Sequence, residues 1–205
     1  MGRSSRQQAE QNRAEILKAA SRLFREHGVD NVSIADIMTA VGLTAGGFYR
    51  HFASKEALVN EVLSTVFAQS SERWKQTCDT NREAAHGGLQ VLIQQYFRKK
   101  QAGQTCPILA FAPHVSHEAT GTETVGLYGS HTEELYRHFR AAALQARPPD
   151  GKTAMSEQDI LVLFAAMVGA GFLAQSVNDQ EWIESLKSAV IASTGLSDPE
   201  KSQAT

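Results

Sequence analysis

The sequence predicts an all-α protein in two parts, a small N-terminal head of three helices and a larger C-terminal helical body. Apolar residues recur three and four positions apart over most of the chain, and no segment shows the strict alternation typical of a strand. Glycine, asparagine and proline, which interrupt helices, separate these segments. We expect the head to cover residues 1–56 and the body residues 57–205.

The first helix is expected to begin near Asn12, because Asn12 followed three residues later by Glu15 matches a capping-box arrangement. Gly28 offers the left-handed conformation that commonly ends a helix. Between them, one apolar face repeats at helical spacing: Ile16, Leu17, Ala20, Leu23 and Phe24.

Two short helices and one long helix are expected next. Ser33 and Asp36 can cap the second helix, which Gly42 ends. A third helix is expected over Thr44–Phe52. Ser54 begins a fourth, whose buried stripe is Leu58, Val59, Val62, Leu63, Val66 and Phe67.

The body continues as helices separated by turn-forming residues. The expected helices cover residues 84–102, 107–117, 122–145, 156–176 and 179–194. The polar tail after Gly195 is expected to fray.

Composition is that of an ordinary globular protein, with 42% hydrophobic and 20% charged residues. The net charge is −2, but residues 1–56 hold eight basic and six acidic side chains, so a mildly basic head precedes an acidic body.

No apolar segment follows the polar Met1–Arg6, so we expect no secretory signal. The apolar run Ile160–Ala174 is shorter than the roughly 18–20 residues needed to cross a bilayer, so we interpret it as a buried helix. Two cysteines are too few for a disulfide framework, which favours the cytoplasm.

The second and third helices, joined by a turn containing Gly42, match a helix-turn-helix. In that unit the second helix lies in the DNA major groove. Its leading residues are small (Ala45, Gly46, Gly47), and hydrogen-bond donors follow (Tyr49, Arg50, His51), of which Arg50 can also reach a guanine. Such helix pairs also occur in proteins that never touch DNA. However, two adjacent glycines cost about 1 kcal/mol each against alanine in a helix, which favours a functional reason for them.

The stretch from Asn12 to Leu63 resembles the DNA-binding head of the TetR regulators, most densely in GLTAGGFYRHFASKEAL from Gly42 to Leu58. The resemblance implies that Ser33 and Thr44 contact phosphates and that residues 45–47 face the bases. It implies that Tyr49, His51 and Lys55 hold the DNA backbone. The character of position 50 varies among relatives, so Arg50 is the least defined of these contacts.

The resemblance further implies a homodimer on a palindromic operator, paired through the last two long helices. These helices contain Ile160–Ala174 and Trp182–Ile191. The alternative is that the first of them is an ordinary core helix of one subunit. A mostly apolar pocket for a small effector is expected among the middle helices, with these lining residues, each of which can also be plain core: Trp74, Tyr96, Phe97, Phe111, His114, Tyr128, His131, Phe164, Met167 and Phe172.

Cys106 is a further candidate in this region, because Pro107 after it indicates a helix N-terminus, where the dipole favours a thiolate. Relatives that sense oxidants or electrophiles look similar here. The alternative is a buried, inert thiol, as free cysteines commonly are. His114 and His117 lie three residues apart, but spacing fixes no third ligand, so we expect no metal site and no cofactor.

These features predict a DNA-binding transcriptional regulator, a repressor released by a small, mostly apolar ligand or by modification of Cys106. An activator, or a regulator without a ligand, fits the same residues. An enzyme is disfavoured because no nucleophile–base pair, phosphate-binding glycine loop or metal triad appears. A helical binding module without DNA recognition is disfavoured by the intact motif at 44–55. The expected partners are double-stranded DNA, a small effector and a second copy of the chain, and no membrane.

Overall fold

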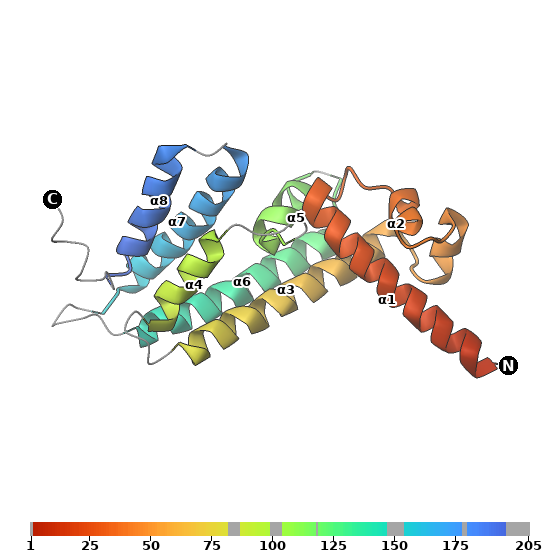
Figure 1. Ribbon diagram of the computed structural model, residues 1–205, viewed down its shortest axis with the longest axis horizontal. Coiled ribbons are helices and arrows are strands. Elements are labelled where there is room, and N and C mark those ends of the chain that lie inside the picture. Colours follow the sequence, from red (N-terminus) through yellow and green to blue (C-terminus); the bar gives the residue numbers. More distant parts are fainter. Residues whose placement is uncertain are drawn as a thin grey trace. The chain divides into compact units, whose positions relative to one another are not determined.

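The computed structural model describes residues 2–81, 87–98, 104–117, 119–146, 154–177 and 180–195, with side chains from residue 6 onward. All regular structure in these ranges is helical, which confirms the predicted fold class. The elements, in chain order, are α1 (Gly2–His27), α2 (Ile34–Ala40), η1 (Ala45–Arg50), α3 (Lys55–Thr80), α4 (Gly87–Phe97), α5 (Pro107–Val115), α6 (Thr122–Gln145), α7 (Glu157–Ser176) and α8 (Glu181–Ala192) (Figure 1).

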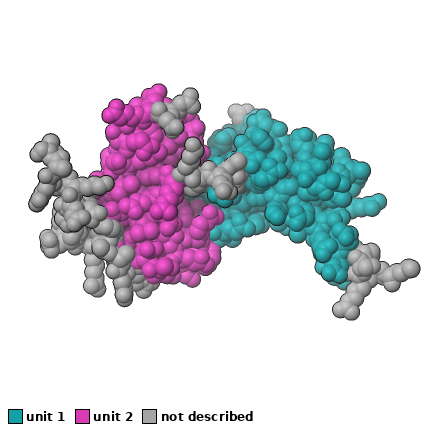
Figure 2. All heavy atoms as spheres, viewed as in Figure 1, with its two compact units in different colours: residues 1–70, 100–132 teal, residues 71–99, 133–205 magenta. Residues whose placement is uncertain are grey.

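The chain packs as two compact units (Figure 2). Unit 1 comprises Met1–Ser70 and Lys100–Thr132, and unit 2 comprises Ser71–Lys99 and Glu133–Thr205. Unit 1 therefore contains the expected head together with α5 and the first part of α6. The functional boundary at residue 56 stays a prediction, because packing alone groups the head with these later segments.

In unit 1, α1 packs against both α2 and α5, and η1 packs against α2. The core is built from the apolar stripes that the periodicity predicts, including Ile16, Ala20, Phe24, Ile37, Met38, Phe48, Leu58, Val62 and Leu63. Gly28 and Gly42 adopt φ values of 83° and 69°, and this left-handed backbone turns the chain at the ends of α1 and α2. These turns set the directions in which the chain continues after α1 and after α2.

The first helix begins earlier than predicted, at Gly2 rather than near Asn12. Residues 2–11 lack an apolar face, but side-chain pairs four residues apart support the helix. Arg6 Nε lies 3.3 Å from Glu10 Oε1, and Gln8 donates to Asn12 Oδ1 at 2.9 Å. Asn12 is thus inside the helix and does not cap it.

The third helix also differs from the prediction. Ala45–Arg50 forms a 3₁₀ helix, shorter and tighter than the α-helix expected over Thr44–Phe52. Thr44 is its N-cap residue, but the Thr44 side chain makes no capping hydrogen bond. By contrast, the predicted Ser33–Asp36 capping box at α2 is confirmed.

In unit 2, α7 and α8 lie side by side and α4 packs against both (Figure 1). Residue 171 is glycine because α4 approaches closely: a Cβ there would lie 2.6 Å from Cε1 of Tyr96. The buried side chains of this unit include Leu89, Ile93, Leu135, Phe139, Ile160 and Met167. The predicted helices over 122–145 and 156–176 match α6 and α7 to within one residue.

Helix α7 is not buried on all sides within the chain, which disagrees with the alternative that it is an ordinary core helix of one subunit. Ile160, Leu163 and Met167 are buried, whereas Leu161 and Phe172 are 53% and 54% exposed. Of the described helices, α7 alone is long and apolar enough to cross a membrane by length and composition, which is weak grounds for a membrane span. Its exposed apolar face needs a different explanation.

Candidate nucleic-acid interface

The η1 element presents an outward surface of small residues next to a large aromatic side chain. Thr44, Ala45, Gly46 and Arg50 are exposed. Tyr49 is 67% exposed, the largest exposed fraction among the large hydrophobic residues that the structure describes. His51 is half-buried at the C-terminal end of η1. The phenol of Tyr49 is therefore available to an external partner.

Nothing in the free chain requires glycine at position 46. Its φ lies outside the left-handed range, and a Cβ placed there would meet no atom within 4 Å. A Cβ at Gly47 would make ordinary contact with Met38 Cε at 3.6 Å. Since alanine is the better helix former, the absence of a side chain at Gly46 favours close approach by another molecule.

Two aromatic side chains anchor η1 in the core. Phe48 and Phe52 are fully or almost fully buried and stack with ring centroids 5.7 Å apart. The Tyr49 ring meets Phe48 edge-on at 5.3 Å. The exposed Tyr49 is thus oriented by a buried aromatic pair.

Ser33 already has intramolecular partners. Its hydroxyl donates to Asp36 Oδ2 at 2.6 Å, and its Oγ accepts from the Asp36 backbone N–H at 3.1 Å. Hydrogen bonds from the Ser33 side chain and backbone lower the pKa of Asp36. Ser33 lies at the exposed start of α2, where its proposed phosphate contact adds to a capping role.

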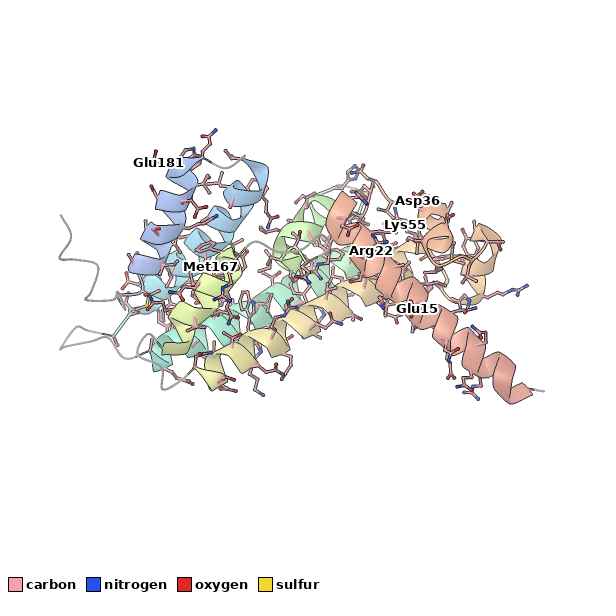
Figure 3. All side chains as sticks on the ribbon, viewed as in Figure 1. Glu15, Arg22, Asp36, Lys55, Met167 and Glu181 are labelled. Carbon is pink, nitrogen blue, oxygen red and sulfur yellow. The ribbon has the colours of Figure 1, made fainter. Side chains whose placement is uncertain are left out.

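Lys55, the first residue of α3, is also engaged (Figure 3). Its Nζ donates to the backbone oxygen of Val29 at 2.8 Å, and the side chain is half-buried. Lys55 therefore ties the start of α3 to the turn after α1. Its three ammonium protons leave capacity for a phosphate beside this bond.

The candidate effector residues of unit 1 gather around α5. As predicted, Cys106 is the N-cap residue of α5, with Pro107 next to it; its thiol makes no capping hydrogen bond and is 4% exposed. Tyr128 donates to the backbone oxygen of Ile108 at 2.9 Å, and burial, followed by Cys106, raises the pKa of its phenol. Phe111 of α5 is fully buried, whereas His131 of α6 stacks on Phe67 of α3 with ring centroids 5.6 Å apart.

Both ends of α5 are held by residues of the expected head. Arg25, in the last turn of α1, donates twice to the backbone oxygen of Thr105, from Nε at 2.9 Å and from a terminal nitrogen at 2.5 Å. At the other end, His114 Nδ1 lies 2.7 Å from Asp30 Oδ1. Sequence reasoning missed Arg25 and Asp30, because both contacts join residues 80 or more positions apart, which no local pattern reports.

A cavity of about 330 Å³ lies beside the His114–Asp30 contact. It is lined by Val29, Asp30, Lys55, Glu56, Val59, His114, His117, Ala119, Thr120 and Gly121. His114 is the only predicted effector residue among them. Within the described residues, no group of three His, Cys, Asp or Glu is arranged to hold a metal ion.

The candidate effector residues of unit 2 are mostly core. Trp74 meets Tyr96 edge-on at 6.2 Å, and Tyr96 meets Phe97 at 5.7 Å. Phe164 packs on Tyr136 and Phe139, each at 5.3 Å. Met167 is fully buried (Figure 3), whereas Phe172 is exposed and contributes little to this core. A second cavity, of about 470 Å³ between the start of α7 and the end of α8, contains none of the predicted residues.

The N-terminal head of this chain is similar in sequence to a known protein family. Residues 16–62 match the family model of bacterial regulatory proteins of the tetR family. The regulator TtgR of Pseudomonas putida is 38% identical over 99 residues, which is 48% of this chain and 47% of TtgR. The chain thus matches about half the length of that relative, which is named as a transcriptional regulator and not as an enzyme.

Solved structures extend the likeness to most of the chain. The reduced form of E. coli NemR superposes with a TM-score of 0.74 at 19% identity, covering 87% of this chain and 95% of NemR. A transcriptional regulator from Saccharomonospora viridis, solved with choline, has a TM-score of 0.66 at 19% identity, covering 88% of this chain and 94% of that protein. At such identities these likenesses establish the fold alone.

Proposed function

We propose that the chain is a regulator of the TetR family, and that it is a cytoplasmic, sequence-specific DNA-binding repressor that acts as a homodimer on a palindromic operator. The match of residues 16–62 to the tetR family model and the 38% identity to TtgR over 99 residues support this proposal. The observation that carries this proposal is the surface of η1, where Gly46 leaves space that the free chain does not use and Tyr49 is exposed beside it. The geometry is what a helix needs in order to approach base edges closely.

The contacts divide by chemistry. Ala45, Gly46 and Gly47 face the bases, so few side-chain hydrogen bonds enter the groove and DNA shape supplies part of the specificity. Arg50 is exposed next to them and reaches either a phosphate or a guanine. Phosphates are held by Ser33, Thr44, Tyr49, His51 and Lys55.

The exposed face of α7 supports the homodimer. Leu161, Ala165, Gly169 and Phe172 follow one another at helical spacing and are all exposed in the single chain. A second copy covering this stripe, together with the exposed Trp182 of α8, removes apolar surface from water. Two heads then read half-sites about one helical turn (~34–36 Å) apart.

Release from DNA requires an effector that favours a second conformation of the chain. A small, mostly apolar ligand among the middle helices, or covalent modification of Cys106, fits the aromatic surroundings of α5. The choline bound to the Saccharomonospora viridis protein supports a small-molecule effector. Because Arg25 and Asp30 hold both ends of α5, a shift of this helix acts directly on the α1–α2 region of the head. The coupling is reciprocal, so operator DNA weakens effector binding equally.

Fluorescence anisotropy with the DNA upstream of its own gene tests this function. Wild-type protein is expected to bind that DNA more tightly than a scrambled duplex, with affinity falling as salt rises. Tyr49→Ala should weaken this binding, whereas Leu144→Ala, which removes an exposed apolar side chain from α6, serves as a control. Equal, weak binding to native and scrambled DNA, followed by a random-sequence selection that enriches nothing, would contradict the proposal.

A further inference from the structure

A bidentate ion pair joins α1 to α3 next to Phe52, which follows η1, the element proposed to read the DNA and called the reading element below. The two terminal nitrogens of Arg13 lie 2.6 and 2.5 Å from the two carboxylate oxygens of Glu61. Arg13 is on α1 and Glu61 is on α3, 48 residues later. A parallel pair of hydrogen bonds fixes the plane of the guanidinium as well as its position.

The same guanidinium lies on the ring of Phe52. The Arg13 Cζ is 4.6 Å from the ring centroid, within the range of a cation–π contact. Phe52 stacks on Phe48, which in turn meets Tyr49 edge-on. A continuous line of contacts therefore runs from Arg13 to the exposed phenol of the reading element.

The charge of Arg13 is already compensated. Both carboxylate oxygens of Glu61 face it, and Glu61 is itself partly shielded from solvent. Arg22, on the same helix, differs because its ion pair is with Glu26, four residues later within α1. Arg22 is thus the matched control (Figure 3).

We propose that Arg13 is a positioning residue for DNA recognition: clamped by Glu61, it holds the Phe52–Phe48 pair, and through it Tyr49, in the orientation that reads the operator. The proposal rests on the proposed DNA-binding function. It distinguishes Arg13 from the phosphate-contacting side chains, because Arg13 acts through protein contacts and not through attraction to DNA.

A charge swap tests the clamp in the full-length chain. Arg13→Glu and Glu61→Arg alone each place like charges together, and each should lower the ratio of operator to scrambled-DNA affinity about tenfold. The double variant restores an opposite pair at unchanged net charge but places a carboxylate at position 13 beside Phe52. It should therefore recover part of the lost affinity ratio and remain below wild type. A double variant as impaired as Arg13→Glu would overturn the proposal.

The salt dependence separates positioning from phosphate contact. In Arg13→Met the slope of log affinity against log salt should equal that of wild type and of Arg22→Met. A slope smaller by about 0.9 would instead show that Arg13 neutralises a phosphate, and would overturn the proposal.

Hydrogen exchange of the free protein tests the contact between Arg13 and Phe52 without DNA. The amides of His51 and Phe52 donate to the Phe48 oxygen at 2.8 and 3.1 Å. In Arg13→Met the hydrogen exchange of these two amides should accelerate about tenfold relative to Arg22→Met, because the Phe52 ring loses its contact with the Arg13 guanidinium. Unchanged exchange would overturn the clamp, whereas accelerated exchange in a protein that binds no DNA would contradict the proposed function instead.

Discussion

The guanidinium of Arg25 donates two hydrogen bonds to the backbone oxygen of Thr105, the residue immediately before Cys106. The last turn of α1 and the first turn of α5 therefore share one fixed point. Since Cys106 is the N-cap residue of α5, we expect a covalent change at its thiol to displace the chain next to that point. We expect a shift of α5, caused by a ligand or by modification of Cys106, to reach α1 through the Arg25–Thr105 hydrogen bonds.

Arg25→Met should uncouple α5 from the head. In a Cys78→Ala background, N-ethylmaleimide treatment should lower the operator affinity of the otherwise unchanged protein, because the adduct does not fit at a residue that is 4% exposed. With Arg25→Met added, treated and untreated protein should differ less than about twofold. Anisotropy titrations measure both, with Arg22→Met as the control. The same loss of affinity with and without Arg25 would contradict the coupling.

Cys78 should behave as a poor nucleophile. Burial, and then the neighbouring Asp79 carboxylate, raise the pKa of its thiol to about 11. Because the thiolate is the reactive form, alkylation should accelerate about tenfold per pH unit between pH 8 and 10. Iodoacetamide rates in a Cys106→Ala variant measure Cys78 alone. A rate that levels off below pH 9.5 would show that the pKa is not raised.

Gly46→Ala should separate stability from DNA binding. The added methyl meets no atom within 4 Å in the free chain. The free energy of unfolding should therefore stay the same or rise by up to about 1 kcal/mol, and the melting temperature should not fall. Operator affinity should fall at least about tenfold if the bases approach this backbone. Gly126→Ala, also in open space but on α6, is the matched control and should leave affinity unchanged. Equal affinities for the two variants would place the bases elsewhere.

Leu161→Asp should convert the dimer to a monomer. Leu161 is exposed in the single chain, so the change costs little within one subunit, but it buries an unpaired carboxylate at the proposed interface. Light scattering coupled to size exclusion should report about twice the chain mass for wild type and the chain mass for the variant. Val125→Asp, an exposed valine on α6, is the control and should stay dimeric. A dimeric Leu161→Asp protein would exclude the α7 face as the interface.

Features that depend on neighbouring residues were predictable from the sequence. The Ser33–Asp36 capping box and the N-cap position of Cys106 depend on spacings of three residues and one residue, and both were confirmed. The same kind of signal failed at Asn12, where a run of pairs four residues apart extends the helix instead. The all-α class followed from periodicity, which the longer helices display over many turns.

Features that depend on distant residues were not predictable. Arg13 and Glu61 are 48 residues apart, and nothing in either neighbourhood indicates that they pair. The expected effector residues illustrate the same limit: aromatic side chains at helical spacing report a buried face, but not whether that face encloses a cavity. Thus Phe172 proved exposed, and of the two cavities described here only one contains a predicted residue, His114.

Selection of binding sites from a random-sequence duplex library tests the central claim most directly. Wild-type protein is expected to enrich inverted repeats with half-sites about one helical turn apart, and Leu161→Asp should fail to enrich the full repeat. Tyr49→Ala should enrich little or nothing. Enrichment of no sequence by the wild-type protein, or of the same sequences by Tyr49→Ala, would contradict the account of this chain as a DNA-reading regulator.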